Sequence, residues 1–146
     1  IDCLNFFQTF NYNQFKNFIR IFIKKRQGYN KEELQLRDNL NLEFNLGLDS
    51  VELYVIYDVF NIDEETYELA KTSVFSEIVV DEVFEDIELN DGKYFAYEVL
   101  PAQYDQRADS AKESIRLLNS KSKATVRILT ARKLSRTSNK CYNEED

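Results

Sequence analysis

Residues 100–118 read LPAQYDQRADSAKESIRLL and contain the only proline of the chain. Pro101 has no backbone N–H and biases Leu100 toward an extended conformation, so we predict that a strand ends at Leu100. Asp105 is a residue type that caps helix N-termini. Beyond it, apolar residues at spacings of three and four predict the buried stripe of a helix. The members of this stripe are Ala108, Ala111, Ile115 and Leu118.

The two-residue period of a strand occurs on both sides of this stretch. The predicted strands are residues 18–24, 51–60, 78–89, 94–100 and 125–134. Between the third and fourth of them, Asn90-Asp91-Gly92 predicts a hairpin turn, because Asp-Gly tolerates positive φ. A further helix is predicted to begin at an N-cap, Asp63, and to bury one stripe. This stripe consists of Tyr67, Ala70 and Val74.

Residues 30–44 carry signals for both a helix and a strand. Their leucines fall at even spacing, which by itself favours a strand. Asn30 followed by Glu33 resembles a capping box, and the run is charged and free of glycine. We therefore predict a helix that ends near Phe44.

The order of these elements predicts an α+β fold, in which a small sheet has helices packed on one face. Two strand–helix–strand units are expected, at residues 18–60 and 93–134, with a helix and a strand between them. One domain would then cover residues 18–134. Residues 1–17 show no clear period and are expected to be irregular, and residues 135–146 are expected to form a polar tail.

Composition argues against several classes of function. The net charge of −7 disfavours a nucleic-acid partner, because phosphates are bound mainly by lysine and arginine. No apolar run approaches the roughly 20 residues that span a bilayer, so no membrane partner is expected. The chain has no histidine and only three scattered glycines, which excludes histidine-dependent catalysis and a glycine-rich phosphate loop. Cys3 and Cys141 indicate neither a disulfide framework nor a zinc site, which fits the cytoplasm.

Two aspartates are candidates for chemistry. Asp105 and Asp109 are four residues apart on a predicted helix, so they could share a divalent metal or act as an acid–base pair. The alternative is an N-cap and an exposed acid. We favour this alternative, because a magnesium site also needs further oxygen ligands. No catalytic residue and no metal ligand is therefore assigned in this chain.

The polar loop between the predicted strand and helix, residues 103–107, is a candidate contact surface. Tyr104 and Arg107 are residue types that are enriched where a partner buries a surface. A local role, in which these side chains hold Pro101 and the helix N-terminus in place, is an equal alternative.

The run from Leu100 to Ala111, LPAQYDQRADSA, resembles the LPGQYDQRADSA segment of a known family. This segment belongs to the N-terminal, PurS-like domain of large phosphoribosylformylglycinamidine synthases of the clostridial type. Shorter similar segments are YELAK (67–71), VFSE (74–77), VDEV (80–83), NLG (45–47) and YDV (57–59). The resemblance covers about residues 18–134, and the PurS-like domain is a small α+β unit with internal pseudo-symmetry.

The resemblance implies a role in purine biosynthesis. The family converts formylglycinamide ribonucleotide, ATP and glutamine into formylglycinamidine ribonucleotide. Its synthase domain, which binds ATP and magnesium, and its glutaminase domain lie further along the chain. The PurS-like domain packs between them, so this chain would be a non-catalytic assembly domain with those two domains as partners and no cofactor of its own. The residues implied in partner binding are Leu100, Pro101, Gln103, Tyr104, Asp105, Gln106, Arg107, Asp109 and Ser110.

Three residues depart from the family pattern. Ala102 replaces a glycine, and Lys112 and Glu113 replace the usual Ala-Gln on the exposed side of the helix. Three alternatives therefore stay open beside the assembly domain. They are a stand-alone regulatory module that binds a small ligand between helix and sheet, a metal enzyme that uses the two aspartates, and a truncated, non-functional copy.

Overall fold

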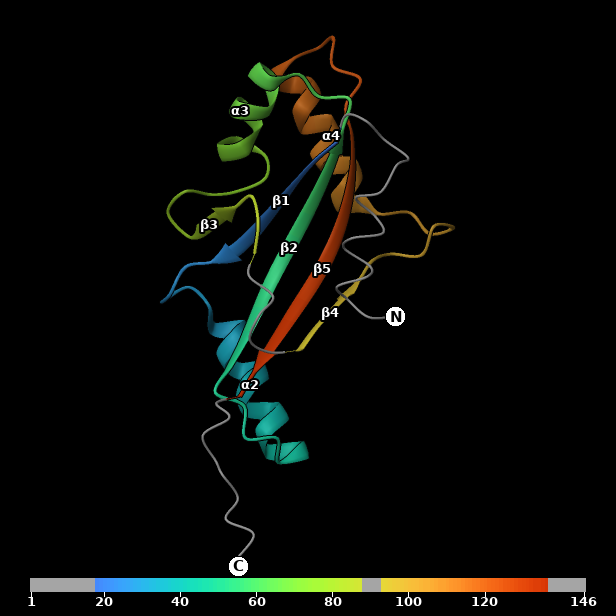
Figure 1. The fold of residues 1–146 in the computed structure, drawn as a ribbon. Helices are drawn as coiled ribbons and strands as arrows, with labels where there is room; N and C mark the ends of the chain where they lie inside the picture. Colours follow the sequence, from blue (N-terminus) through green and yellow to red (C-terminus); the bar gives the residue numbers. More distant parts are fainter. Residues whose placement is uncertain (1–17, 88–92, 137–146) are drawn as a thin grey trace, which may run out of the picture.

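The computed structural model describes residues 18–87 and 93–136, which form one antiparallel sheet and three helices (Figure 1). In chain order the elements are β1 (Phe18–Lys25), α2 (Lys31–Phe44), β2 (Ser50–Phe60), α3 (Glu64–Ser73), β3 (Asp81–Phe84), β4 (Lys93–Tyr97), α4 (Gln106–Leu118) and β5 (Thr125–Ser135). The strand order is β3-β1-β2-β5-β4, and every neighbouring pair is antiparallel. The predicted α+β class is confirmed.

One face of the sheet is covered by α3 and α4, which lie side by side near one end of the sheet, while α2 lies near the other end (Figure 1). Alternate residues of the strands point to the covered face, as the two-residue period requires. The main buried members of this core are Ile21, Ile23, Val59, Tyr67, Ala70, Phe75, Ala111, Ile115 and Ala124. Of the predicted helical stripes, Tyr67, Ala70, Ala111 and Ile115 are buried in this core and Val74 packs against it, whereas Ala108 and Leu118 are not members of it.

The opposite face of the sheet carries a second apolar cluster and a buried ion pair. The cluster consists of Phe22, Tyr54, Ile56, Leu129 and Ala131. Arg20 donates from Nε and Nη2 to the two carboxylate oxygens of Asp58, at 2.7 and 2.9 Å. Asp58 is fully buried, and the two residues are directly opposite on β1 and β2. This bidentate geometry offsets the cost of removing both charges from water.

The predicted hairpin between residues 78–89 and 94–100 is wrong. β3 pairs with β1 and β4 pairs with β5, so these two strands lie at opposite edges of the sheet. Asn90-Asp91-Gly92 lies outside the described residues. A turn signal reports local backbone preference, whereas the position of β3 is set by packing, because Val83 contacts one apolar cluster and Phe84 contacts the other.

Two predicted strands are shorter than expected, and one residue of a predicted buried stripe is exposed. β3 covers only Asp81–Phe84, and Ile78 and Val79 are exposed in the turn that precedes it. β4 ends at Tyr97, so residues 98–100 continue without ladder pairing. Leu118 is 38% exposed, because it lies in the last turn of α4, beyond the part of the helix that packs on the sheet.

The N-terminus of α2 lacks the predicted capping box, although the helix itself is confirmed. Asn30 makes no side-chain cap, and its Oδ1 instead accepts a hydrogen bond from the N–H of Gly28. Glu33 accepts hydrogen bonds from the sheet and from the side chain of Asn30, not from the backbone N–H of Asn30 that a capping box requires. The caps of the other two helices, Asp63 and Asp105, are confirmed.

Within residues 18–87 and 93–136, no helix combines the length and the apolar character that crossing a bilayer requires. β5 ends at Ser135, one residue beyond the end of the predicted last strand. The predicted irregular segment, residues 1–17, and most of the predicted tail lie outside the described residues.

Candidate functional site

A hydrogen-bonded turn and a helix cap fix the stretch between β4 and α4. The N–H of Gln103 donates to the carbonyl oxygen of Leu100 at 2.8 Å, which closes a tight turn around Pro101. Asp105 then caps α4, and its Oδ1 accepts from the backbone N–H groups of Arg107 and Ala108 at 3.1 and 3.2 Å. The predicted N-cap is thereby confirmed, and it stabilises the start of the helix.

Tyr104 and Asp109 form a further local contact. The Tyr104 hydroxyl donates to Oδ2 of Asp109 at 2.7 Å, and this hydrogen bond raises the pKa of Tyr104. Asp105 and Asp109 therefore both accept local hydrogen bonds rather than facing each other across an open site. In the described ranges, no group of three or more acidic or cysteine side chains is arranged to hold a metal ion.

Large apolar side chains remain exposed along β4 and this loop. We call them the junction surface, which consists of Phe95, Tyr97, Val99, Leu100 and Tyr104. Leu100 is 64% exposed and Tyr104 is 73% exposed. The other predicted contact residues are also accessible: Pro101, Gln103, Gln106, Arg107 and Ser110 are exposed, whereas Asp105 and Asp109 are half-buried. An apolar surface on an edge strand is typical of a protein interface.

Arg132 lies under the aromatic part of the junction surface. Its guanidinium carbon is 5.9 Å from the centre of the Phe95 ring and 5.6 Å from that of Tyr97. Its Nη2 also donates to the Tyr97 hydroxyl at 3.3 Å. These contacts hold the two rings in place, so a partner would meet side chains that have already lost much of their rotamer freedom.

A cavity of about 440 Å³ opens beside the junction surface, between the sheet and the N-terminal turns of α2 and α4. Residues from three neighbouring strands, Tyr57, Tyr97 and Thr130, line it together with Arg107. Burial raises the pKa of Tyr57, and the adjacent Arg107, with which it shares a hydrogen bond, acts in the opposite direction. Of these four lining residues, only Arg107 was predicted as a site residue. Tyr57, Tyr97 and Thr130 are far apart in the sequence, and the pairing of β2, β5 and β4 brings them together.

A second apolar surface lies on α2 and the turn after it. Four of its side chains are more than one-third exposed, and we call them the α2 surface: Leu34, Leu42, Phe44 and Leu46. The one buried residue of this helix is Glu33. Sequence analysis found the even spacing of these leucines but did not identify them as an exposed surface.

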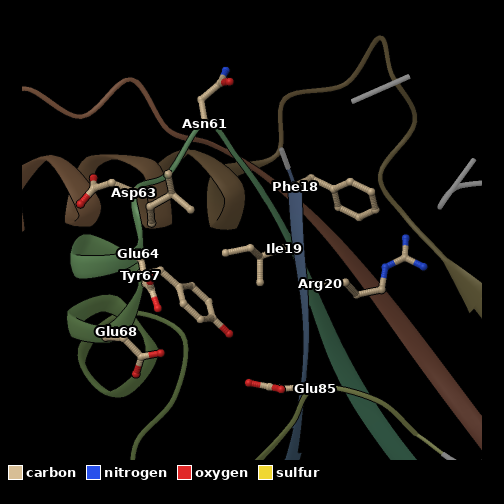
Figure 2. A pocket seen from close by; sticks show the side chains of 10 residues that line it. Phe18, Ile19, Arg20, Asn61, Asp63, Glu64, Tyr67, Glu68 and Glu85 are labelled. Carbon is tan, nitrogen blue, oxygen red and sulfur yellow. The ribbon is translucent and has the colours of Figure 1, made fainter. Parts of the chain in front are cut away.

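A larger cavity, of about 840 Å³, lies between α3, β1 and the segment after β3 (Figure 2). We call it the α3 cavity. It is lined by Phe18, Ile19, Arg20, Asn61, Ile62, Asp63, Glu64, Tyr67, Glu68 and Glu85. None of these residues was predicted as a site residue, because an acidic first turn is an ordinary feature of helices.

No family model, curated protein or solved structure matches this chain. Its function therefore has to be inferred from the chemistry of its exposed surfaces and cavities. The junction surface and the α2 surface both offer exposed apolar area. Exposed apolar area of this kind is typical of surfaces that bind a partner.

Proposed function

We propose that this chain is a non-catalytic assembly domain that docks other protein domains through the junction surface. The observation that carries this proposal is the exposure of five large apolar side chains on one edge strand and the loop that follows it. Full burial of a large apolar side chain from water stabilises by about 1.5–3 kcal/mol, and these side chains, which are 41–73% exposed, can each gain part of that free energy in an interface. The fold does not use this area, because Leu100 and Tyr104 contribute little to either apolar cluster.

The partners in this proposal are the synthase and glutaminase domains of phosphoribosylformylglycinamidine synthase, in the purine biosynthesis pathway of the cytoplasm. The support is the resemblance of residues 100–111 to the PurS-like domain, since this segment provides the loop part of the junction surface. The α2 surface adds support, because a domain that packs between two others needs two separate contact areas. ATP and magnesium would bind in the synthase domain.

Within the junction, Tyr104 and Arg107 are expected to contribute most to docking. Tyr104 presents a rigid ring whose hydroxyl is already anchored on Asp109. No ion pair of the described residues involves Arg107, so its charge is available to a carboxylate of the partner. Tyrosine and arginine are the residue types that most often dominate interface energetics.

The test is to mix the purified chain with the synthase and glutaminase portions of a related enzyme and to measure association by calorimetry. We expect Tyr104→Ala and Arg107→Ala to weaken association by about tenfold or more without lowering the melting temperature appreciably. Leu117→Ala is the matched control, because Leu117 is an equally exposed apolar residue at the far end of α4. A folded wild-type chain that does not associate contradicts the proposal, as does an equal loss with the control.

A second candidate function is a regulatory module that binds a small ligand. The observation that favours it is the cavity of about 440 Å³ between helix and sheet, which has the size of a small-molecule site. This function predicts saturable thermal stabilisation by a metabolite, which Tyr57→Phe reduces. If the chain shows neither association nor ligand binding, the remaining alternatives are a metal enzyme that uses Asp105 and Asp109 and a non-functional copy.

A further inference from the structure

The α3 cavity has a strongly acidic rim. Carboxylates from the first turns of α3 and from the segment after β3 surround it: Asp63, Glu64, Glu68 and Glu85 (Figure 2). One of them, Asp63, is engaged as the α3 cap, and its hydrogen bonds from the hydroxyl and the N–H of Thr66 lower its pKa. The other three are not used in capping.

The nearby cations neutralise only part of this rim. Arg20 is held by Asp58, with which it makes two short hydrogen bonds. Lys71 is 3.6 Å from Glu85, in a pair whose carboxylate is largely exposed. No ion pair of the described residues involves Glu64 or Glu68. The cavity therefore keeps a net negative charge.

A buried hydroxyl faces the same space. Tyr67 is 6% exposed, and its hydroxyl oxygen is buried without a hydrogen-bond partner. Figure 2 shows its ring pointing from α3 toward β1, with the hydroxyl in the space between α3, β1 and Glu85. Burial raises the pKa of Tyr67, and the charges of Glu85 and Glu68 raise it further, so the group stays protonated. Buried hydroxyls almost always have a partner, because leaving one unpaired costs stability.

We infer that the α3 cavity binds a small aliphatic polyamine. One ammonium group would donate to the Tyr67 hydroxyl oxygen, and the others would pair with Glu64 and Glu68. The methylene segments would lie against the apolar floor of the cavity, to which Ile19 and Ile62 contribute. A volume of about 840 Å³ is within the range of small-molecule sites. The hydroxyl is closed to water in the free chain, and an ammonium group is no smaller than a water molecule, so binding must be accompanied by a shift of the Tyr67 side chain or its neighbours.

A polyamine fits this site better than a metal ion does. Among the side chains that the structure describes, no three carboxylates converge as metal ligands. A protonated amine needs no such convergence, since it carries several donors and spreads its charges along a chain. It also supplies the N–H donor that the Tyr67 oxygen lacks.

The test uses the full chain and spermidine, with sodium chloride at equal ionic strength as the salt control. We expect saturable binding in calorimetry and a rise in melting temperature beyond that of the salt control. Glu68→Gln should weaken spermidine binding by about threefold. Glu65→Gln is the matched control, because Glu65 is in the same helical turn but does not line the cavity, and it should leave binding nearly unchanged.

The decisive variant is Tyr67→Phe. It removes a hydroxyl that has no partner in the free chain, so its melting temperature should be at least that of the wild type. Its affinity for spermidine should nevertheless fall by about tenfold, because the hydrogen bond to a charged donor is lost. The inference is overturned if spermidine acts no better than salt, if Glu65→Gln weakens binding as much as Glu68→Gln, or if Tyr67→Phe binds like the wild type.

Discussion

The helices α2 and α4 have nearly the same length and the same place in the topology, but they are held to the sheet in different ways. Each connects two neighbouring antiparallel strands, β1 to β2 and β4 to β5. α4 buries Ala111 and Ile115, whereas the buried residue of α2 is Glu33. The one fully buried anchor of α4 is thus apolar and that of α2 is a carboxylate, while Leu34 and Leu42 of α2 are exposed and Leu36 and Leu40 are half-buried.

The anchor of α2 is a set of hydrogen bonds to a single side chain. Glu33 Oε1 accepts from the backbone N–H of Leu53 at 2.9 Å, and its Oε2 accepts from Lys24 Nζ and Asn30 Nδ2 at 3.0 and 3.1 Å. The carboxylate thus ties the helix to β1 and β2 at once. Because this anchor is polar, the exposed apolar residues of α2, Leu34, Leu42 and Phe44, stay available for another surface, and the helix can serve the fold and an interface together.

The largest effect is expected from the apolar anchor. Ile115→Ala should lower the free energy of unfolding by about 2–5 kcal/mol, because Ile115 is fully buried and truncation leaves a cavity between α4 and the sheet. Urea unfolding measures this loss. Leu117→Ala, in the same helix at 89% exposure, should change the free energy of unfolding by less than about 0.5 kcal/mol. Similar losses for the two variants would show that α4 is not held by this stripe.

The polar anchor should give the next largest effect. Glu33→Ala should lower the free energy of unfolding by about 2 kcal/mol, because it leaves the Leu53 N–H and the Lys24 ammonium without their acceptor. Amide hydrogen exchange adds a local readout, since exchange at Leu53 should accelerate more than exchange at the β2–β5 ladder. Glu33→Gln keeps one acceptor oxygen, so its free energy of unfolding should fall by less than that of Glu33→Ala. An unchanged exchange rate of the Leu53 amide in Glu33→Ala would show that Glu33 does not anchor α2 to β2.

A smaller effect is expected from the helix cap. Asp105→Ala should lower the free energy of unfolding by about 1 kcal/mol, because two N–H groups of the first turn of α4 lose their acceptor. Asp105→Asn retains an acceptor oxygen and serves as the control in thermal unfolding. α2 has no side-chain cap, so it has no corresponding contribution to lose. If Asp105→Asn lowers the free energy of unfolding as much as Asp105→Ala does, the charge of Asp105, rather than its hydrogen bonds, stabilises the start of α4.

The smallest effect on stability is expected at the α2 surface. Leu42→Ser should change the free energy of unfolding by less than about 0.5 kcal/mol, because Leu42 is 85% exposed. If the α2 surface docks a partner domain, the same variant should weaken association while its urea midpoint stays unchanged. A clear loss of stability would show that the leucines of α2 support the fold after all.

Much of the local structure could be predicted from sequence periods. β1, β2 and β5 follow from alternating side chains, and the buried stripes of α3 and α4 follow from spacings of three and four. The caps Asp63 and Asp105 were identified from residue type and position alone. The pairing of β3 was missed, because the Asn90-Asp91-Gly92 signal carries no information about which edge of the sheet a strand will join.

The site was predictable in part. The accessibility of Tyr104 and Arg107 followed from the strand-to-helix junction, although Arg107 lies in the first turn of α4 and not in the predicted loop. The cavity beside them did not, since Tyr57, Tyr97 and Thr130 come from separate strands. The α3 cavity was also missed. The sequence places Tyr67 on a buried helical stripe, but it does not show whether the hydroxyl of Tyr67 finds a hydrogen-bond partner.

The sequence by itself determined the elements, the faces that they bury and the caps that begin two of the helices, because these depend on interactions between residues close along the chain. Only the tertiary structure decided that β3 and β4 take opposite edges, that α2 is anchored by Glu33, and that the junction surface and the two cavities exist. Those features arise from contacts between distant segments, and such contacts form only when the sheet is assembled.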